Sequence, residues 1–208
     1  KRRKPLDEGG PEMVSKIIFV FKTHFDIGFT DLSENVIRRY GNEMLREVLE
    51  TCEATADMGP LHYVWTMPSW PLSHILKHGD PALLPRLIKL IENGQIVWHS
   101  LPFTSHTDFS APDEYARTLM YARELSERFG KPVPRTAKMT DVPGHGLMLP
   151  EVLCGAGISF LHLGANEFST PPELPDLFFW ETPSGKKLLT MYSRGGYGTG
   201  LIPPEDWP

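Results

Sequence analysis

Short apolar runs alternate with amphipathic stretches along most of the chain. The run over 16–21 (KIIFVF) is apolar and rich in β-branched residues, which predicts a strand buried on both faces. Ser33 is a suitable N-cap for a helix that we expect to continue to about Ala56. One buried stripe is predicted along this helix, because apolar residues recur every four positions at Val36, Tyr40, Met44, Val48 and Cys52.

The same alternation continues through the rest of the chain. We expect further strands over 61–67, 95–100, 136–140 and 158–163, and helices over 72–78, 81–92, 110–130 and 147–154. Two strand-like runs, 178–181 and 187–192, flank Ser184-Gly185 and predict a β-hairpin. Repeated strand–helix alternation is typical of an α/β fold with a parallel sheet. A complete eight-stranded barrel usually needs about 250 residues, so we expect either an open sheet or most of a larger barrel.

Composition and charge narrow the class of protein. The chain has 208 residues and a net charge of −5, so we expect no nucleic-acid partner. No apolar run approaches the length of about 18 residues that predicts a membrane span. Cys52 and Cys154 are too few for a disulfide framework, which favours a reducing, cytoplasmic location. Residues 1–15 are polar and charged, and we expect them to form a tail or linker.

The first candidate site follows the first predicted strand. His24 and Asp26 are two residues apart, so both side chains leave the same face of an extended chain. They stand at the carboxyl end of a strand, where α/β folds bind their ligands. An imidazole and a carboxylate at such a position can supply half of a zinc site. The alternative is a polar pair that only hydrogen-bonds the loop.

The second candidate site follows the fourth predicted strand. Asp141 stands at its carboxyl end, ahead of the Pro143-Gly144 turn that leads into the next helix. It is a candidate metal ligand or nucleophile, and the alternative is a structural acid near the helix start. Three ligands from two parallel strands would leave one metal position open, as a catalytic site needs.

Two weaker candidates lie between these sites. His106 and Asp108 form a second His-X-Asp segment that competes with the first for the metal, and we interpret it as contacting substrate or as a surface loop. Trp70 stands between two prolines and is a candidate wall for a sugar ring. The chain contains no Gly-rich phosphate loop, no Gly-X-Ser-X-Gly elbow and no Cys-X-X-Cys pair, so nucleotide hydrolysis, serine hydrolysis and zinc fingers lose support.

Taken together, these segments resemble glycoside hydrolase family 38, the class II α-mannosidases. The family's first motif, His-X-Asp followed by Pro-Gly-Trp, corresponds here to His24–Phe29. Its second motif, Asp-Pro-Phe-Gly-His-Ser, corresponds to Asp141–Gly146. Trp180 precedes the Ser184-Gly185 hairpin as a Trp does in the family. The resemblance covers about residues 16–195, and among its departures Phe29 replaces Trp and Gly146 replaces Ser.

The resemblance implies a seven-stranded (β/α) barrel and a zinc-dependent retaining glycoside hydrolase with a carbohydrate substrate. His24 and Asp26 would be zinc ligands, and Asp141 would be both a zinc ligand and the nucleophile. His145, Trp70, His106 and Asp108 are expected to contact the substrate.

Residues 16–208 would be the N-terminal catalytic domain with its C-terminal part missing. The family's acid/base Asp and its fourth zinc ligand, a His, have no place in the stretch after Asp141. We therefore expect the 208-residue chain alone to be inactive.

Two other functions fit the same segments. A metal-dependent carbohydrate deacetylase would use a metal-bound water, and its histidine pair would have to be His99 and His106, which are seven residues apart. A barrel that binds sugar without catalysis would keep the fold and lose the chemistry. Bound metal and released acetate distinguish the three.

Overall fold

Strands in the described part of the chain form two neighbouring sheets. The computed structural model describes residues 15–16, 18–166, 168–170 and 172–194. The first sheet is parallel and has the order β1 (Phe21–Lys22), β2 (Trp65–Met67), β3 (Ile96–Trp98). The second has the order β4 (Thr136–Asp141), β5 (Phe160–Ala165), β7 (Lys187–Tyr192), β6 (Leu177–Glu181), with only β6 antiparallel. The prediction of an α/β fold with parallel sheets is confirmed.

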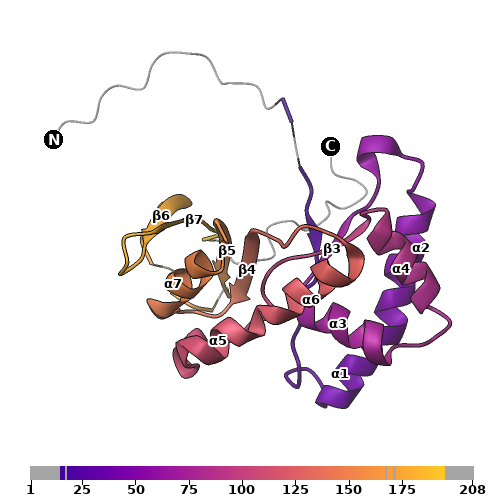
Figure 1. Ribbon diagram of the computed structural model, residues 1–208, viewed down its shortest axis with the longest axis horizontal. Coiled ribbons are helices and arrows are strands. Elements are labelled where there is room, and N and C mark those ends of the chain that lie inside the picture. The colour runs from indigo at the N-terminus through magenta and orange to yellow at the C-terminus, as the bar shows by residue number, and fades with distance from the viewer. Residues whose placement is uncertain (1–14, 17, 167, 171, 195–208) are drawn as a thin grey trace.

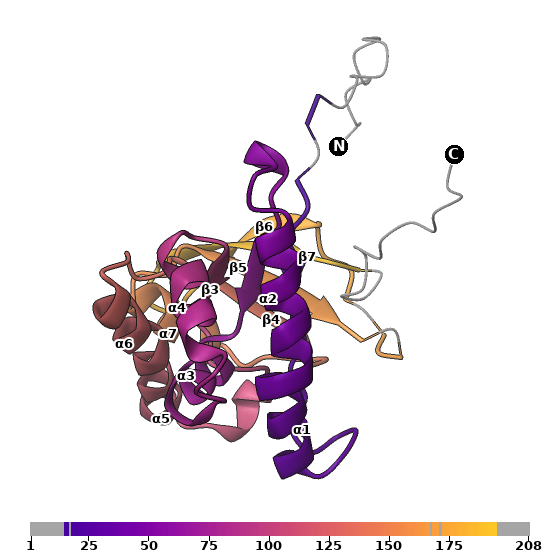
Figure 2. The same ribbon diagram turned by 90° about the vertical axis from the view of Figure 1, so that its right-hand side faces the viewer.

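Helices connect the parallel strands. Between β1 and β2, α1 (Ser33–Arg39), a π-helical turn (Tyr40–Met44) and α2 (Leu45–Ala54) follow one another as a single rod (Figure 2). The later connections contain α3 (Ser69–His78) and α4 (Leu84–Glu92), then α5 (Pro112–Thr118) and α6 (Met120–Phe129), then α7 (Met148–Gly155). None of the helices in the described ranges is both long enough and apolar enough to cross a bilayer.

Each sheet buries one face against its own set of helices. Around β2 and β3, buried residues such as Trp65, Met67 and Ile96 pack with side chains of α2, α3, α4 and α6. These helices and β3 lie together in the right half of Figure 1. Around β4, β5 and β7, Met139 and Leu161 pack with side chains of α5 and α7. These strands and helices lie together in the left half of Figure 1. Alternate strand residues point to opposite faces, so these apolar positions define the helix-covered face.

The opposite face of the strands carries polar side chains. Thr140 and Lys138 alternate with the buried Met139 and Ala137 on β4, and His162 lies between two buried leucines on β5. Lys22 is paired in register with Thr66 on the same side of the first sheet. The strands are therefore amphipathic, and the polar face leads toward the carboxyl ends where the candidate site lies.

The two sheets meet between β3 and β4 without a continuous ladder. Ser100, just past β3, donates its backbone N–H to the carbonyl of Thr136 at 2.9 Å and its hydroxyl to the carbonyl of Pro134 at 2.7 Å. These bonds bring the end of β3 to the start of β4. The carboxyl ends of β1 and β4 consequently face one another across the polar side.

Most predicted elements are found with shifted ends, but the first strand is a correction. Ile18, Phe19 and Val20 are all largely exposed, so the run over 16–21 is not buried on both faces, and residue 17 lies outside the described residues. Only Phe21 and Lys22 pair with β2, and no strand of the described residues covers the other side of β1, which leaves the preceding apolar residues exposed. The strand expected over 61–67 is also shorter, since Gly59–Leu61 forms a helical turn.

Candidate metal centre

Phe25, which stands between His24 and Asp26, anchors the segment that follows β1. Phe25 is buried and packs edge-on against Tyr40 and in a tilted arrangement against Trp70, with ring centroids at 4.7 Å and 5.7 Å. Alternation then turns His24 and Asp26 to the other side. The Tyr40 hydroxyl donates to the backbone carbonyl of His24 at 2.5 Å. Burial, together with the nearby Asp26 carboxylate, raises the pKa of Tyr40 and keeps this hydroxyl protonated.

Asp141 reaches the same place through an unusual backbone conformation. It has φ of 81°, and it is the only residue other than glycine with positive φ among the described residues. Strict alternation along β4 would put its side chain with Met139 on the helix-covered face. The left-handed conformation turns it away from that face, at the cost of about 1 kcal/mol for an L residue. Asn166, just past β5, donates its side-chain amide to the carbonyl of Asp141 at 3.1 Å and supports this turn.

The three predicted ligands come together at the carboxyl ends of β1 and β4. His24 Nε2 lies 2.8 Å from Asp26 Oδ1 and 3.8 Å from Asp141 Oδ2. One ligand atom from each of the three residues lies within 4.8 Å of the others. The side chains are 17%, 33% and 35% exposed, so the group is sheltered but open to solvent. Within the described residues this is the one such group of His, Cys, Asp and Glu side chains.

The donor set fits a divalent transition metal such as zinc. Zinc binds imidazole nitrogen and carboxylate oxygen at about 2.0–2.2 Å, which in a tetrahedral site separates ligand atoms by about 3.3–3.6 Å. The His24–Asp141 distance of 3.8 Å is close to this range, and the His24–Asp26 distance of 2.8 Å needs only a small opening. One nitrogen and two oxygens leave a coordination position for a further ligand.

The polar face of the strands, beneath the three candidate ligands, carries the nitrogen-containing side chains of Lys138, His99 and His162. Burial, assisted by the neighbouring Lys22, lowers the pKa of Lys138 to about 6. Burial likewise lowers the pKa of His99 to about 3 and that of His162 to about 4, with Lys138 and Lys22 adding to both shifts. Near neutral pH the two imidazoles are therefore uncharged.

The second His-X-Asp segment has a different environment. His106 and Asp108 are exposed, and the residue between them, Thr107, is buried and pairs with His145 Nδ1 at 3.1 Å. Burial lowers the pKa of His145 to about 4, although Asp108 opposes this shift. The segment thus packs against the loop that follows Asp141. Its two polar side chains are not part of the group formed by the three ligands.

The remaining candidates have packing contacts. The Trp70 ring contacts Phe25, His74 and Phe103, with centroid distances of 5.7, 5.2 and 6.1 Å. Through its contact with Phe25, Trp70 supports the segment that carries His24 and Asp26, on the side opposite to these two side chains. His99 is buried and its Nδ1 accepts the backbone N–H of Leu101 at 3.2 Å, whereas His106 is exposed. The two histidines that a deacetylase would need do not form a pair.

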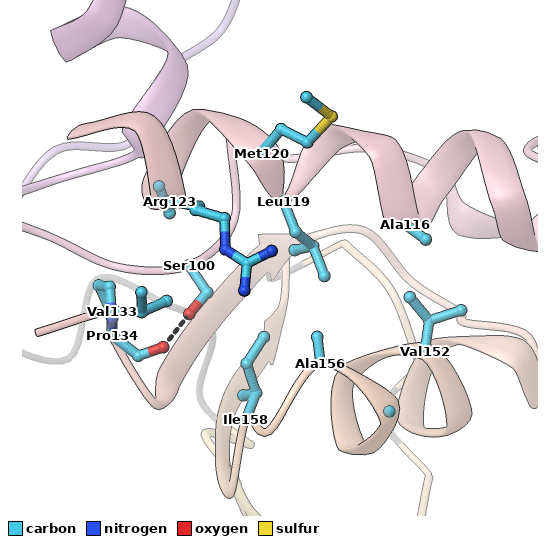
Figure 3. Close-up of a pocket in the computed structure, with 12 residues that line it drawn as sticks. Ser100, Ala116, Leu119, Met120, Arg123, Val133, Pro134, Val152, Ala156 and Ile158 are labelled. Atoms are coloured by element: carbon cyan, nitrogen blue, oxygen red, sulfur yellow. Dashed lines mark hydrogen bonds between the residues drawn. The ribbon is translucent and has the colours of Figure 1, made fainter. Parts of the chain in front are cut away.

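One cavity in the described part of the chain lies at the other end of the strands. It has a volume of about 520 Å³, and Figure 3 shows the Arg123 side chain reaching into it from the helix above Ser100 and Ile158. These residues adjoin the amino ends of β4 and β5, away from Asp141. A second cavity of about 390 Å³ adjoins the loop after Asp141 and is lined by His145 together with aromatic side chains at Phe178, Trp180 and Tyr192.

Sequence reasoning missed the residues that support the ligands. Tyr40 was expected only as part of a buried helix stripe, yet its hydroxyl holds the His24 carbonyl. Asn166 and Thr140 were not singled out, and they contact Asp141 and His24 respectively. The helical spacing predicted that Tyr40 faces the core, but nothing in the sequence indicated the hydrogen bond from its hydroxyl to the His24 carbonyl.

Comparison with known proteins identifies the family. The family model for the glycosyl hydrolases family 38 N-terminal domain matches residues 14–203. The chain belongs to glycoside hydrolase family 38. No curated protein sequence matches this member.

Solved structures with a similar fold include two proteins from Enterococcus faecalis. An α-mannosidase from Enterococcus faecalis V583 superposes with a TM-score of 0.73 at 18% identity, covering 88% of this chain and 21% of that one. A family 38 protein from Enterococcus faecalis gives 0.61 at 16% identity, covering 83% and 18%. A 4-α-glucanotransferase from Thermococcus litoralis gives 0.60 at 16% identity, covering 83% and 27%. The family 38 chain described here therefore spans about a fifth of the length of that α-mannosidase.

Proposed function

We propose that this chain forms the metal-binding part of the active site of a zinc-dependent retaining glycoside hydrolase, similar to the α-mannosidases. The observation that carries the proposal is the convergence of His24, Asp26 and Asp141 within 4.8 Å at the carboxyl ends of β1 and β4, one strand from each sheet. Membership of family 38 supports a carbohydrate substrate. The polar inner face of both sheets supports a (β/α) barrel, in which these side chains would line the interior.

In this proposal Asp141 is the nucleophile. One of its carboxylate oxygens forms a bond to the anomeric carbon while the bond to the leaving glycosidic oxygen breaks, and water later releases the sugar from the ester. When bound, zinc would supply charge that holds adjacent sugar hydroxyls and favours a distorted ring. His24 and Asp26 fix the position of that charge beside the nucleophile.

A retaining mechanism also needs a carboxylic acid to protonate the leaving oxygen. Retaining enzymes place the two carboxyl groups about 5–5.5 Å apart. Asp26 is assigned here to the metal, so we propose that the acid comes from outside the described residues. His145, with the aromatic cavity beside it, Trp70 and the exposed residues His106 and Asp108 stay proposed substrate contacts.

Metal binding tests the first part of the proposal. We expect the purified 208-residue chain to bind one zinc ion, measured by competition with a chromophoric chelator, and His24→Ala to remove this binding. His78→Ala is the matched control, because His78 is exposed and lies on α3 outside the ligand group. Equal zinc binding by both variants contradicts the proposal.

Covalent trapping tests the second part. A 2-deoxy-2-fluoro α-mannosyl fluoride should leave a sugar on Asp141 of an enzyme that contains this chain and its acid, located by mass spectrometry of the digested protein. Asp141→Asn should prevent labelling, whereas Asp57→Asn, an exposed site beyond α2, should not. A label on another carboxylate, or release of acetate from acetylated sugars without labelling, contradicts a glycosidase role for Asp141.

A further inference from the structure

One threonine lies between the candidate metal centre and the half-buried Lys138 beneath it. Thr140 is 1% exposed on the polar face of β4, one residue before Asp141. Its Oγ1 lies 2.8 Å from Lys138 Nζ and 3.4 Å from His24 Nδ1. A single hydroxyl therefore connects β4 with the ligand segment that follows β1, across 116 residues of sequence.

The two nitrogens of His24 face different groups. Nε2 is directed at Asp26 and Asp141, whereas Nδ1 is directed at Thr140. A metal held between the two carboxylates and His24 would take the Nε2 lone pair, and a neutral imidazole then carries its proton on Nδ1. Histidine ligands generally donate this second N–H to a fixed acceptor, which sets the tautomer and the ring orientation.

Thr140 has the groups that this role requires. A hydroxyl has one donor hydrogen and two acceptor lone pairs. The Lys138 nitrogen donates to one lone pair, which leaves the second lone pair for the Nδ1–H of His24. Because Lys138 occupies one acceptor position, the rotation of the hydroxyl is restricted. Valine has nearly the same shape as threonine but offers neither a donor nor an acceptor.

We propose that Thr140, held by Lys138, is a positioning residue that fixes His24 as an Nε2 metal ligand. The proposal rests on the metal site of the proposed function and adds to it the residue that orients one ligand. Thr140 touches neither metal nor substrate in this role. Its effect on binding is transmitted only through the His24 ring.

Zinc affinity of Thr140 variants gives the first test. We expect Thr140→Val to weaken zinc binding by the chain about 10-fold or more, in the range found when a supporting partner of a ligand is lost. Thr140→Ser keeps the hydroxyl and should restore affinity to within about threefold of the unmodified chain. Thr190→Val is the matched control, because Thr190 is also buried on a strand but its hydroxyl donates to the carbonyl of Leu188 within β7.

The tautomer of His24 gives a second test that a general loss of packing would not change. In the zinc-loaded chain, long-range ¹⁵N–¹H spectra of the imidazoles should show His24 protonated at Nδ1 with a slowly exchanging proton. In Thr140→Val that proton should exchange rapidly, while the spectra of His162 stay unchanged. Lys138→Met should lower zinc affinity by a smaller factor, less than about tenfold. If Thr140→Val does not fold, Lys138→Met takes its place, and an unchanged zinc affinity in that variant overturns the positioning role.

The outcomes separate this inference from the function on which it rests. If the unmodified chain binds no zinc, the metal site itself is wrong and the positioning role is wrong with it. If the unmodified chain binds zinc and Thr140→Val binds it equally well, only the positioning role is overturned. An equal loss in Thr190→Val, or a metal-bound His24 protonated at Nε2, overturns it as well.

Discussion

Two segments of this protein have the same His-X-Asp pattern and follow the two outer strands of the first sheet, β1 and β3, but their side chains are placed in opposite ways. In the first, His24 and Asp26 are sheltered and point at Asp141. In the second, His106 and Asp108 are exposed, and the residue between them makes the specific contact. The difference arises from what each segment packs against.

The middle residue of each segment fills a different environment. Phe25 enters an aromatic group with Tyr40 and Trp70, which directs both flanking side chains to the polar face. Thr107 instead turns toward His145 in the loop after Asp141. The pattern therefore contributes to the candidate metal centre only in the segment whose middle residue packs among aromatic rings behind the site.

The largest expected effect separates the two segments by zinc affinity. Asp26→Ala should weaken zinc binding more than about 100-fold, beyond the effect of losing a supporting partner. Asp108→Ala should leave zinc affinity within about twofold, because its carboxylate is outside the ligand group. Titration with a competing chelator measures both, and similar losses in the two variants would falsify the distinction.

The next effect is on stability and compares the two middle residues. Phe25→Ala removes a buried aromatic ring and should lower the free energy of unfolding by about 3–5 kcal/mol. Thr107→Val removes one hydrogen bond with little change of volume and should cost about 1 kcal/mol. Urea unfolding followed by circular dichroism gives both values. Equal costs would show that Phe25 does not anchor its segment.

A pH dependence sharpens the role of the second segment. Burial holds the pKa of His145 at about 4, below its ordinary value of 6.5, so the folded state favours the neutral ring. As the pH falls below 6.5 the unfolded chain takes up this proton first, and the free energy of unfolding decreases until about pH 4. In His145→Gln this decrease should be smaller, leaving the share due to the other histidines whose pKa burial lowers, His74, His99 and His162. Urea midpoints at several pH values measure it, and unchanged curves would contradict the buried contact with Thr107.

Much of the site follows from the positions of residues along the strands. Side-chain alternation along an extended chain correctly predicted that His24 and Asp26 share one face. The position of Asp141 at the carboxyl end of another strand correctly predicted that it lies near them. The positive φ of Asp141 was outside the reach of this reasoning, because it depends on contacts such as the one from Asn166. The partners Tyr40 and Thr140 were also missed, since their bonds to His24 join elements that are distant in sequence.

The fold shows the same division between local and distant causes. Helix positions and the hairpin at Ser184-Gly185 were predicted because caps, turns and periodic apolar residues act locally. The apolar run ending at Phe21 predicted a doubly covered strand, but coverage depends on which neighbours lie on either side. Hydrophobic pattern thus shows that a segment tends to be buried without showing what covers it.

The smallest expected effect concerns Gly146, where family 38 proteins have Ser in the pattern that the chain otherwise resembles. A Cβ at Gly146 would lie 2.5 Å from Asp108 Oδ1, so this position needs glycine while the Asp108 carboxylate stays where it is. Gly146→Ala should displace that carboxylate, which is the free end of an exposed side chain, and change the free energy of unfolding by less than about 0.5 kcal/mol. Zinc affinity should stay unchanged, because neither residue belongs to the ligand group. A weaker zinc site in Gly146→Ala would show that the two His-X-Asp segments are coupled through this loop, and the contrast between them would have to be abandoned.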